Sequence, residues 1–118
     1  MTTTKDLAAI PAADIALLGG GRLATLDCTS GRSIVDIALA YPEALVDGFD
    51  GDGDRIAAAR AEATAVRLTG RIAFRHVDPA QLRAAYLPGY DVVVTPKGLR
   101  DVAARLISDA GVVVVQES

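Results

Sequence analysis

Apolar residues in this chain follow two different spacings, which divide it into strand-like and helix-like segments. Short, nearly continuous apolar runs bounded by Gly, Pro or Asp predict strands, here over Leu23–Asp27, Ala44–Asp50, Ile72–Val77, Tyr90–Thr95 and Val112–Gln116. Apolar residues three and four positions apart predict helices, over Asp6–Leu18 with a break at Pro11, Ile34–Tyr41, Asp54–Leu68, Ala80–Tyr86 and Leu99–Asp109. Strands and helices therefore alternate along nearly the whole chain.

This alternation predicts an open, doubly wound α/β sheet. A strand, a helix and a second strand in succession form a right-handed parallel crossover. The run Tyr90–Thr95 has the continuous apolar character of a parallel strand that is buried on both faces. No linker or internal repeat divides the sequence. We therefore expect one domain over residues 1–118, with an N-terminal helix and a glycine turn in 1–21 and the doubly wound core in 22–118.

Polar residues stand at the ends of the first four predicted strands. They are Asp27, Asp50, Asp78 and Thr95. In an open parallel sheet, ligands bind outside the carboxyl ends of the strands, and an acid that closes the second strand can accept hydrogen bonds from a ribose diol. The turn after the first strand brings backbone N–H groups to the same edge. The pattern predicts a binding site for a nucleotide-like ligand at this edge of the sheet.

Composition argues against several other classes of function. The net charge is −3, the pI is about 5.0 and only 4% of residues are aromatic, whereas nucleic-acid binding usually needs a basic stripe with aromatic platforms. The single cysteine, Cys28, has no companion ligands at zinc spacing, so no metal is assigned. No apolar run is long enough to cross a bilayer, and the first residues lack the pattern of a secretory signal. We expect no nucleic-acid or membrane partner and a cytoplasmic location.

Two common loop motifs are absent, and the single histidine has two interpretations. A dinucleotide-binding turn reads G-x-G-x-x-G, whereas residues 29–34 read Thr-Ser-Gly-Arg-Ser-Ile. Residues 50–54 begin like a calcium loop, but Arg55 and Ala61 replace the Gly and the Glu that such a loop requires. His76, near the end of the third predicted strand, fits either a general base or a packing or surface residue.

Five features stand in register along the sequence: Leu26-Asp27, Gly31, Gly48-Phe49-Asp50, Phe74 through Asp78, and Tyr90-Asp91-Val92-Val93-Val94. In this order they resemble the class I S-adenosylmethionine-dependent methyltransferases over about Leu23 to Glu117. The resemblance implies a three-layer Rossmann-like methyltransferase fold. Its mostly parallel sheet would have about five strands and would lack the family's usual C-terminal hairpin strands. The resemblance also implies S-adenosylmethionine as the cofactor.

The resemblance assigns roles to individual residues. Asp27 would steady the glycine turn and face the methionine amino group, Asp50 would hold the ribose hydroxyls, and Asp78 would accept from the adenine amino group. The other positions that match the family's cofactor site are Thr29, Gly31, Gly51, Val77, Pro79 and Thr95. No catalytic residue is assigned. Thr29 and Ser33 occupy the positions of the first and third glycines of the family's turn.

By this resemblance, the chain is expected to transfer a methyl group to an unidentified small molecule. Two alternatives stay open: a partner or regulatory subunit that keeps the fold without catalysis, and a different reaction on the same fold. The chain ends after its fifth predicted strand, whereas the family continues into two more strands. The valine-rich strand 112–116 is then a flat edge that must be covered or paired. We expect a homodimer or a partner protein at this edge.

Overall fold

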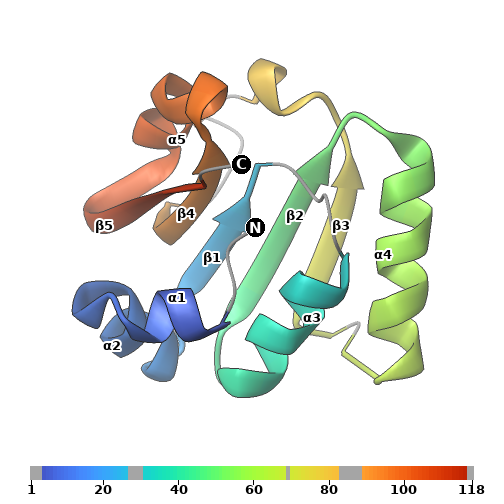
Figure 1. Cartoon of the computed structure of the whole chain (residues 1–118), viewed down its shortest axis with the longest axis horizontal. Coiled ribbons are helices and arrows are strands. Elements are labelled where there is room, and N and C mark those ends of the chain that lie inside the picture. The colour runs from blue at the N-terminus through green and yellow to red at the C-terminus, as the bar shows by residue number, and fades with distance from the viewer. Residues whose placement is uncertain (1–3, 27–30, 69, 83–88, 117–118) are drawn as a thin grey trace.

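A computed structural model describes residues 4–26, 31–68, 70–82 and 89–116 of the chain. Strands and helices alternate along these residues (Figure 1). The order is α1 (Thr4–Ala8), α2 (Pro11–Leu18), β1 (Arg22–Thr25), α3 (Gly31–Ala40), β2 (Leu45–Asp50), α4 (Gly53–Ala65), β3 (Ile72–His76), the 3-10 turn η1 (Pro79–Gln81), β4 (Tyr90–Pro96), the 3-10 turn η3 (Lys97–Leu99), α5 (Arg100–Leu106) and β5 (Ile107–Gln116).

The described strands form one five-stranded sheet in the order β3-β2-β1-β4-β5, and every neighbouring pair is parallel. From β1 the chain winds outward through β2 to β3, then returns to the other side of β1 for β4 and β5. The strand order therefore reverses between β1 and β4, which is where open α/β sheets bind ligands. The predicted α/β fold with about five parallel strands is confirmed.

Each face of the sheet has its own apolar core. On one face, residues of α1 to α4 pack with alternate strand residues such as Leu23, Val46 and Val92. On the other face, α5 packs with Ala24, Val93 and the other members of the second cluster. Figure 1 shows α3 in front of the strands and α4 running beside β3. The three layers expected from the sequence are present, because helices cover both faces.

Several predicted element boundaries need correction. The first helix does break near Pro11, which begins α2 and needs no N–H there. The helix predicted from Ala80 is instead the short turn η1 with an extended Leu82, and residues 83–88 lie outside the described residues. The last helix ends at Leu106 rather than Asp109, because Ile107 already pairs with Tyr90 of β4.

A glycine permits the irregular start of β5. The pairing of β5 with β4 jumps from Tyr90–Ile107 to Val92–Val112, so extra residues of β5 bulge between these pairs. A Cβ atom on Gly111 would lie 2.9 Å from the Tyr90 carbonyl oxygen and 2.8 Å from the Ile107 Cβ. The bulge therefore depends on the absence of a side chain at this position.

The guanidinium of Arg71 closes the C-terminal end of α3. It donates to the carbonyl oxygens of Ala38 at 2.9 Å, Tyr41 at 3.1 Å and Ala44 at 3.0 Å. The last carbonyls of a helix have no partner within the helix, so this one cation, just before β3, supplies donors at the end of α3 and in the turn after it, where the Tyr41 carbonyl also accepts from the Ala44 N–H at 3.0 Å. Arg71 thereby ties α3, the following turn and β3 together.

Among the described residues, none of the helices has the length and apolar character needed to span a membrane.

Candidate functional site

A cavity of about 590 Å³ lies at the carboxyl ends of β1, β2 and β3, next to the reversal in strand order. It is lined by Leu26, Asp50, Gly51, Asp52, Gly53, Arg55, Asp78, Pro79 and Leu99. Its volume is typical of small-molecule sites, and its lining combines apolar side chains with a few convergent polar groups. This cavity is the candidate functional site.

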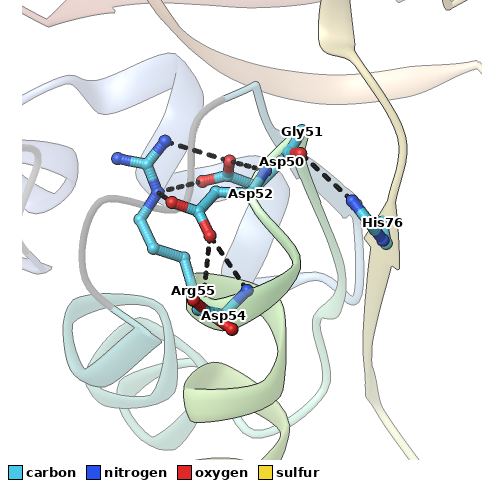
Figure 2. Close-up of polar contacts among 6 residues, drawn as sticks. All are labelled: Asp50, Gly51, Asp52, Asp54, Arg55 and His76. Atoms are coloured by element: carbon cyan, nitrogen blue, oxygen red, sulfur yellow. Dashed lines mark hydrogen bonds and ion pairs between the residues drawn. The ribbon is translucent and has the colours of Figure 1, made fainter.

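Asp50, the last residue of β2, places a buried carboxylate in this cavity. Its side chain is only 3% exposed. Oδ1 accepts hydrogen bonds from the Asp52 backbone N–H at 2.8 Å and from Arg55 Nη2 at 3.1 Å, and Oδ2 lies 3.0 Å from Arg55 Nε (Figure 2). Two guanidinium nitrogens thus meet two carboxylate oxygens in a fork. The buried negative charge is paired and its orientation is fixed.

The turn after Asp50 is held by a helix cap. The Asp52 side chain accepts from the backbone N–H groups of Asp54 at 2.9 Å and Arg55 at 3.3 Å, which satisfies two free donors at the start of α4 (Figure 2). The sequence predicts a helix that begins at Asp54, which is wrong: α4 begins at Gly53 and Asp52 caps it. Starting the helix earlier sets the direction in which Arg55 leaves its first turn.

His76 braces the same turn from β3. Its Nε2 lies 3.0 Å from the Gly51 carbonyl oxygen, which can only accept, so this nitrogen carries the hydrogen (Figure 2). A Cβ on Gly53 would approach the His76 ring carbon Cε1 to 3.1 Å, so the ring lies against this glycine. His76 does not line the cavity. His76 is exposed, so of its two predicted interpretations the geometry favours a packing or surface residue, here one that supports the loop.

The loop after β3 forms the facing wall. Asp78 Oδ1 accepts from the Ala80 backbone N–H at 3.0 Å and thereby caps η1, which Pro79 begins. A Cβ on Gly51 would lie 3.7 Å from the Asp78 Cα, in ordinary contact, so the two loops lie against each other. Carboxylates from two strand ends therefore share one cavity with the apolar side chains of Leu26, Pro79 and Leu99.

Only some of the predicted site residues line the cavity. Four of them line the cavity: Asp50, Gly51, Asp78 and Pro79. Asp27 and Thr29 lie outside the described residues. Val77 is half-buried and packs against the cluster on the α5 side of the sheet. Thr95 is fully buried, and its hydroxyl donates to the Pro96 carbonyl oxygen at 2.9 Å.

Gly31 has a structural requirement that the sequence does not reveal. It begins α3, and a Cβ at this position would lie 2.6 Å from the Cα and 2.7 Å from the Cβ of Ala59 on α4. Such distances are shorter than real contacts, so the close approach of α3 and α4 depends on glycine here. A role for Gly31 beside a cofactor stays a prediction.

Five residues that line the cavity are absent from the sequence-predicted set: Leu26, Asp52, Gly53, Arg55 and Leu99. Asp52 carries a detectable signal, because an aspartate two residues after a strand-ending acid and just before a helix is a typical cap. Arg55 and Leu99 carry none in the sequence. Their position in the cavity depends on where α4 begins and on where the chain turns after β4.

A second cavity, of about 850 Å³, lies along the outer edge of β3, with Phe49, Arg60, Phe74, Arg75 and Leu82 among the residues that line it. Arg60 donates to the Phe74 carbonyl oxygen from Nη2 at 2.8 Å and from Nε at 3.2 Å, and so satisfies an acceptor on this edge strand. This larger cavity is remote from the reversal in strand order, and none of the described residues that line it carries a carboxylate. We therefore assign the candidate site to the smaller cavity.

Two tyrosines have raised pKa values, and both lie outside the candidate site. Burial, together with the hydrogen bond to Asp14 and its charge, raises the pKa of Tyr41 to about 12. Burial, followed by the hydrogen bond to Asp47, raises the pKa of Tyr90 well above its ordinary value. Both phenols act as structural hydrogen-bond donors.

No protein-family model matches the sequence, and no curated protein matches it. Solved structures do match. A methyltransferase from Thiobacillus denitrificans in complex with S-adenosylhomocysteine aligns with a TM-score of 0.72 and 21% identity, over 98% of this chain and 49% of that one. A methyltransferase from Geobacter sulfurreducens, also with S-adenosylhomocysteine, gives 0.70 and 20%, over 83% and 42%. PKMT2 from Rickettsia typhi, with the same ligand, gives 0.69 and 15%, over 81% and 20%.

These similarities identify the fold. The chain has the fold of class I S-adenosylmethionine-dependent methyltransferases, as its sequence features predict. It spans less than half the length of each of these three proteins.

Proposed function

We propose that the chain binds S-adenosylmethionine in the cavity at the carboxyl ends of β1, β2 and β3 and serves in methyl transfer to a small molecule. The observation that carries this proposal is the buried carboxylate of Asp50 in a 590 Å³ cavity, at the point where the strand order reverses. Three proteins of the same fold were solved with S-adenosylhomocysteine, the product that S-adenosylmethionine leaves after methyl transfer.

The donors and acceptors of the cavity fit an adenosine group. Asp50 offers carboxylate oxygens to the ribose hydroxyls, and Asp78 offers an acceptor to the adenine amino group. Leu26, Pro79 and Leu99 supply apolar surface for the purine ring. Gly51 has no side chain between the two acids, so a ribose can approach its backbone.

The remaining predicted residues complete this proposal. Asp27, Thr29 and Gly31 would face the methionine part, Val77 would flank the adenine, and Thr95 would lie near the methyl donor. When bound, S-adenosylmethionine supplies an electrophilic methyl group for direct displacement, a reaction in which positioning provides much of the rate. The role that we propose for the chain is to bind and orient the cofactor, and no residue is assigned as an acid or base.

A calorimetric titration tests the proposal. The full chain is titrated with S-adenosylmethionine and S-adenosylhomocysteine, and Asp50→Ala is compared with Asp54→Ala, whose carboxylate is on the first turn of α4 and does not line the cavity. Hydrogen bonds to a charged group contribute about 1.5–3 kcal/mol, so Asp50→Ala should weaken binding by about tenfold or more. Asp54→Ala should change it by less than about twofold. Absence of heat with either ligand, from protein shown to be folded by circular dichroism, would refute the cofactor proposal.

We also propose that a second copy of the chain or a partner protein covers β5. From Val112 to Val115 this edge strand is half-buried, with β4 on one side only. Unpaired strand edges promote association. Sedimentation velocity should give a dimer or a complex, and a monodisperse monomer that does not bind hydrophobic dye would argue against this proposal.

The alternative is a subunit that binds the cofactor but does not catalyse. It is supported by the first and third glycine positions of the family's turn, which hold Thr29 and Ser33 in this chain. A chain of this kind should bind S-adenosylmethionine yet release no S-adenosylhomocysteine with any small-molecule acceptor, unless a second protein is added.

A further inference from the structure

The guanidinium of Arg55 is paired with the carboxylate of Asp50, which the proposed ribose contact also requires. Arg55 Nε lies 3.0 Å from Asp50 Oδ2, and Arg55 Nη2 donates to Asp50 Oδ1 at 3.1 Å. The backbone N–H of Asp52 also donates to Oδ1, at 2.8 Å. Both carboxylate oxygens are therefore already engaged, and the Asp50 side chain has only 3% of its surface exposed. A ribose diol that binds both oxygens from the cavity, as the guanidinium does, must displace Arg55 from Asp50.

The side chain of Arg55 also lies near a second carboxylate, that of Asp52. It is 46% exposed, so its outward movement requires little rearrangement of packed residues. The carboxylate of Asp52 lies 3.8 Å from Arg55 Nε and is 48% exposed. Arg55 already contacts both carboxylates, so it can leave the buried Asp50 and keep its ion pair with the solvated Asp52 on the same turn. Its backbone N–H donates to Asp52 Oδ1 at 3.3 Å, so the main chain of Arg55 is held to the same turn.

Resting on the proposed function, we infer that Arg55 sets the affinity of the cavity for the nucleoside by covering Asp50, and that it turns toward Asp52 when a ribose diol binds. The free energy needed to separate Arg55 from Asp50 is subtracted from the binding free energy. Removing the guanidinium should therefore tighten binding, which is unusual for a polar residue that lines a ligand site.

A double-mutant cycle tests this inference. Calorimetry gives the Kd of S-adenosylhomocysteine for wild type, Arg55→Gln, Asp50→Asn and the double variant. Partly exposed ion pairs contribute up to about 1 kcal/mol, so Arg55→Gln should lower the Kd by about two- to fivefold. In the Asp50→Asn background the same change should give no gain, because the acceptor that Arg55 covers is gone. Arg55→Lys keeps the charge but not the fork, and its Kd should lie between those of wild type and Arg55→Gln.

The matched control is Arg105→Gln, which removes an exposed guanidinium from α5, away from the cavity. Its Kd should equal that of wild type. A Kd for Arg55→Gln that equals or exceeds the wild-type value, with unchanged circular dichroism, would overturn the inference and leave the proposed function standing. Absence of binding by wild type and by Arg55→Gln alike would overturn both.

Discussion

The hydroxyl of Tyr90 donates a 2.6 Å hydrogen bond to Asp47 Oδ2, across the strand that separates them. Tyr90 begins β4 and Asp47 lies on β2, with β1 between the two strands. The small side chain of Ala24, which lies on β1 in the same buried cluster as Tyr90, is compatible with this reach. The bond links the two halves of the sheet on either side of the reversal in strand order.

Replacing Tyr90 by Phe should destabilise the chain by about 1–3 kcal/mol, because the Asp47 carboxylate loses its donor while the ring remains packed. Urea unfolding measured by circular dichroism gives this value. Asp47→Asn is the matched variant, since its amide oxygen can still accept from the phenol, and it should cost less. A larger loss in Asp47→Asn than in Tyr90→Phe would mean that the charge of Asp47, rather than the hydrogen bond, stabilises the sheet.

The free energy of unfolding should fall at alkaline pH because of the buried phenol of Tyr41. Tyr41 donates to Asp14 Oδ1 at 2.7 Å, and its pKa rises from 10.0 to about 12 on folding. The folded state therefore holds a proton that the unfolded state releases between these values, and the stabilisation, complete below pH 10, is lost as the pH rises toward 12. Thermal melts across this range should show a falling Tm. Tyr41→Phe should be less stable at neutral pH and should show a smaller alkaline decrease. An unchanged decrease in this variant would assign the effect to other groups.

Arg71 should be difficult to replace. Its guanidinium donates to three carbonyl oxygens at the end of α3 and in the turn that follows it, and Arg71→Ala removes all three of these hydrogen bonds, at an expected cost of about 2–4 kcal/mol. Arg71→Lys keeps the charge but has a point-like ammonium in place of the planar fork, so it should recover only part of the loss. The exposed Arg105→Ala on α5 serves as the control, and denaturant titration should give it a change within about 0.5 kcal/mol.

The predictable part of this fold is the part set by local periodicity and by general rules of α/β topology. Short, nearly continuous apolar runs predict the strands. The rule that ligands bind at the carboxyl ends of parallel strands is enough to predict that Asp50 and Asp78 share one cavity. Arg55 could not be assigned in this way. Its side chain reaches Asp50 from the first turn of α4, and the start of that helix at Gly53 is fixed by the Asp52 cap.

The errors in element boundaries have a related cause. The end of the last helix depends on the pairing of Ile107 with Tyr90, a contact between residues far apart in the sequence. Local propensity favours a helix through Asp109, and tertiary pairing overrides it. The requirement for Gly31 is similar, because it arises from Ala59 on another helix.

Gly31 gives the sharpest test of helix packing. A methyl group at this position would lie 2.6 Å from the Ala59 Cα, so α3 and α4 must move apart to accept Gly31→Ala. Overpacking of this kind typically costs about 1–3 kcal/mol. The control is Gly98→Ala, where a Cβ would meet nothing within 4 Å, and its free energy of unfolding should be unchanged or slightly higher. If Gly31→Ala instead keeps full stability but loses affinity for S-adenosylhomocysteine, the glycine is required by the ligand rather than by Ala59.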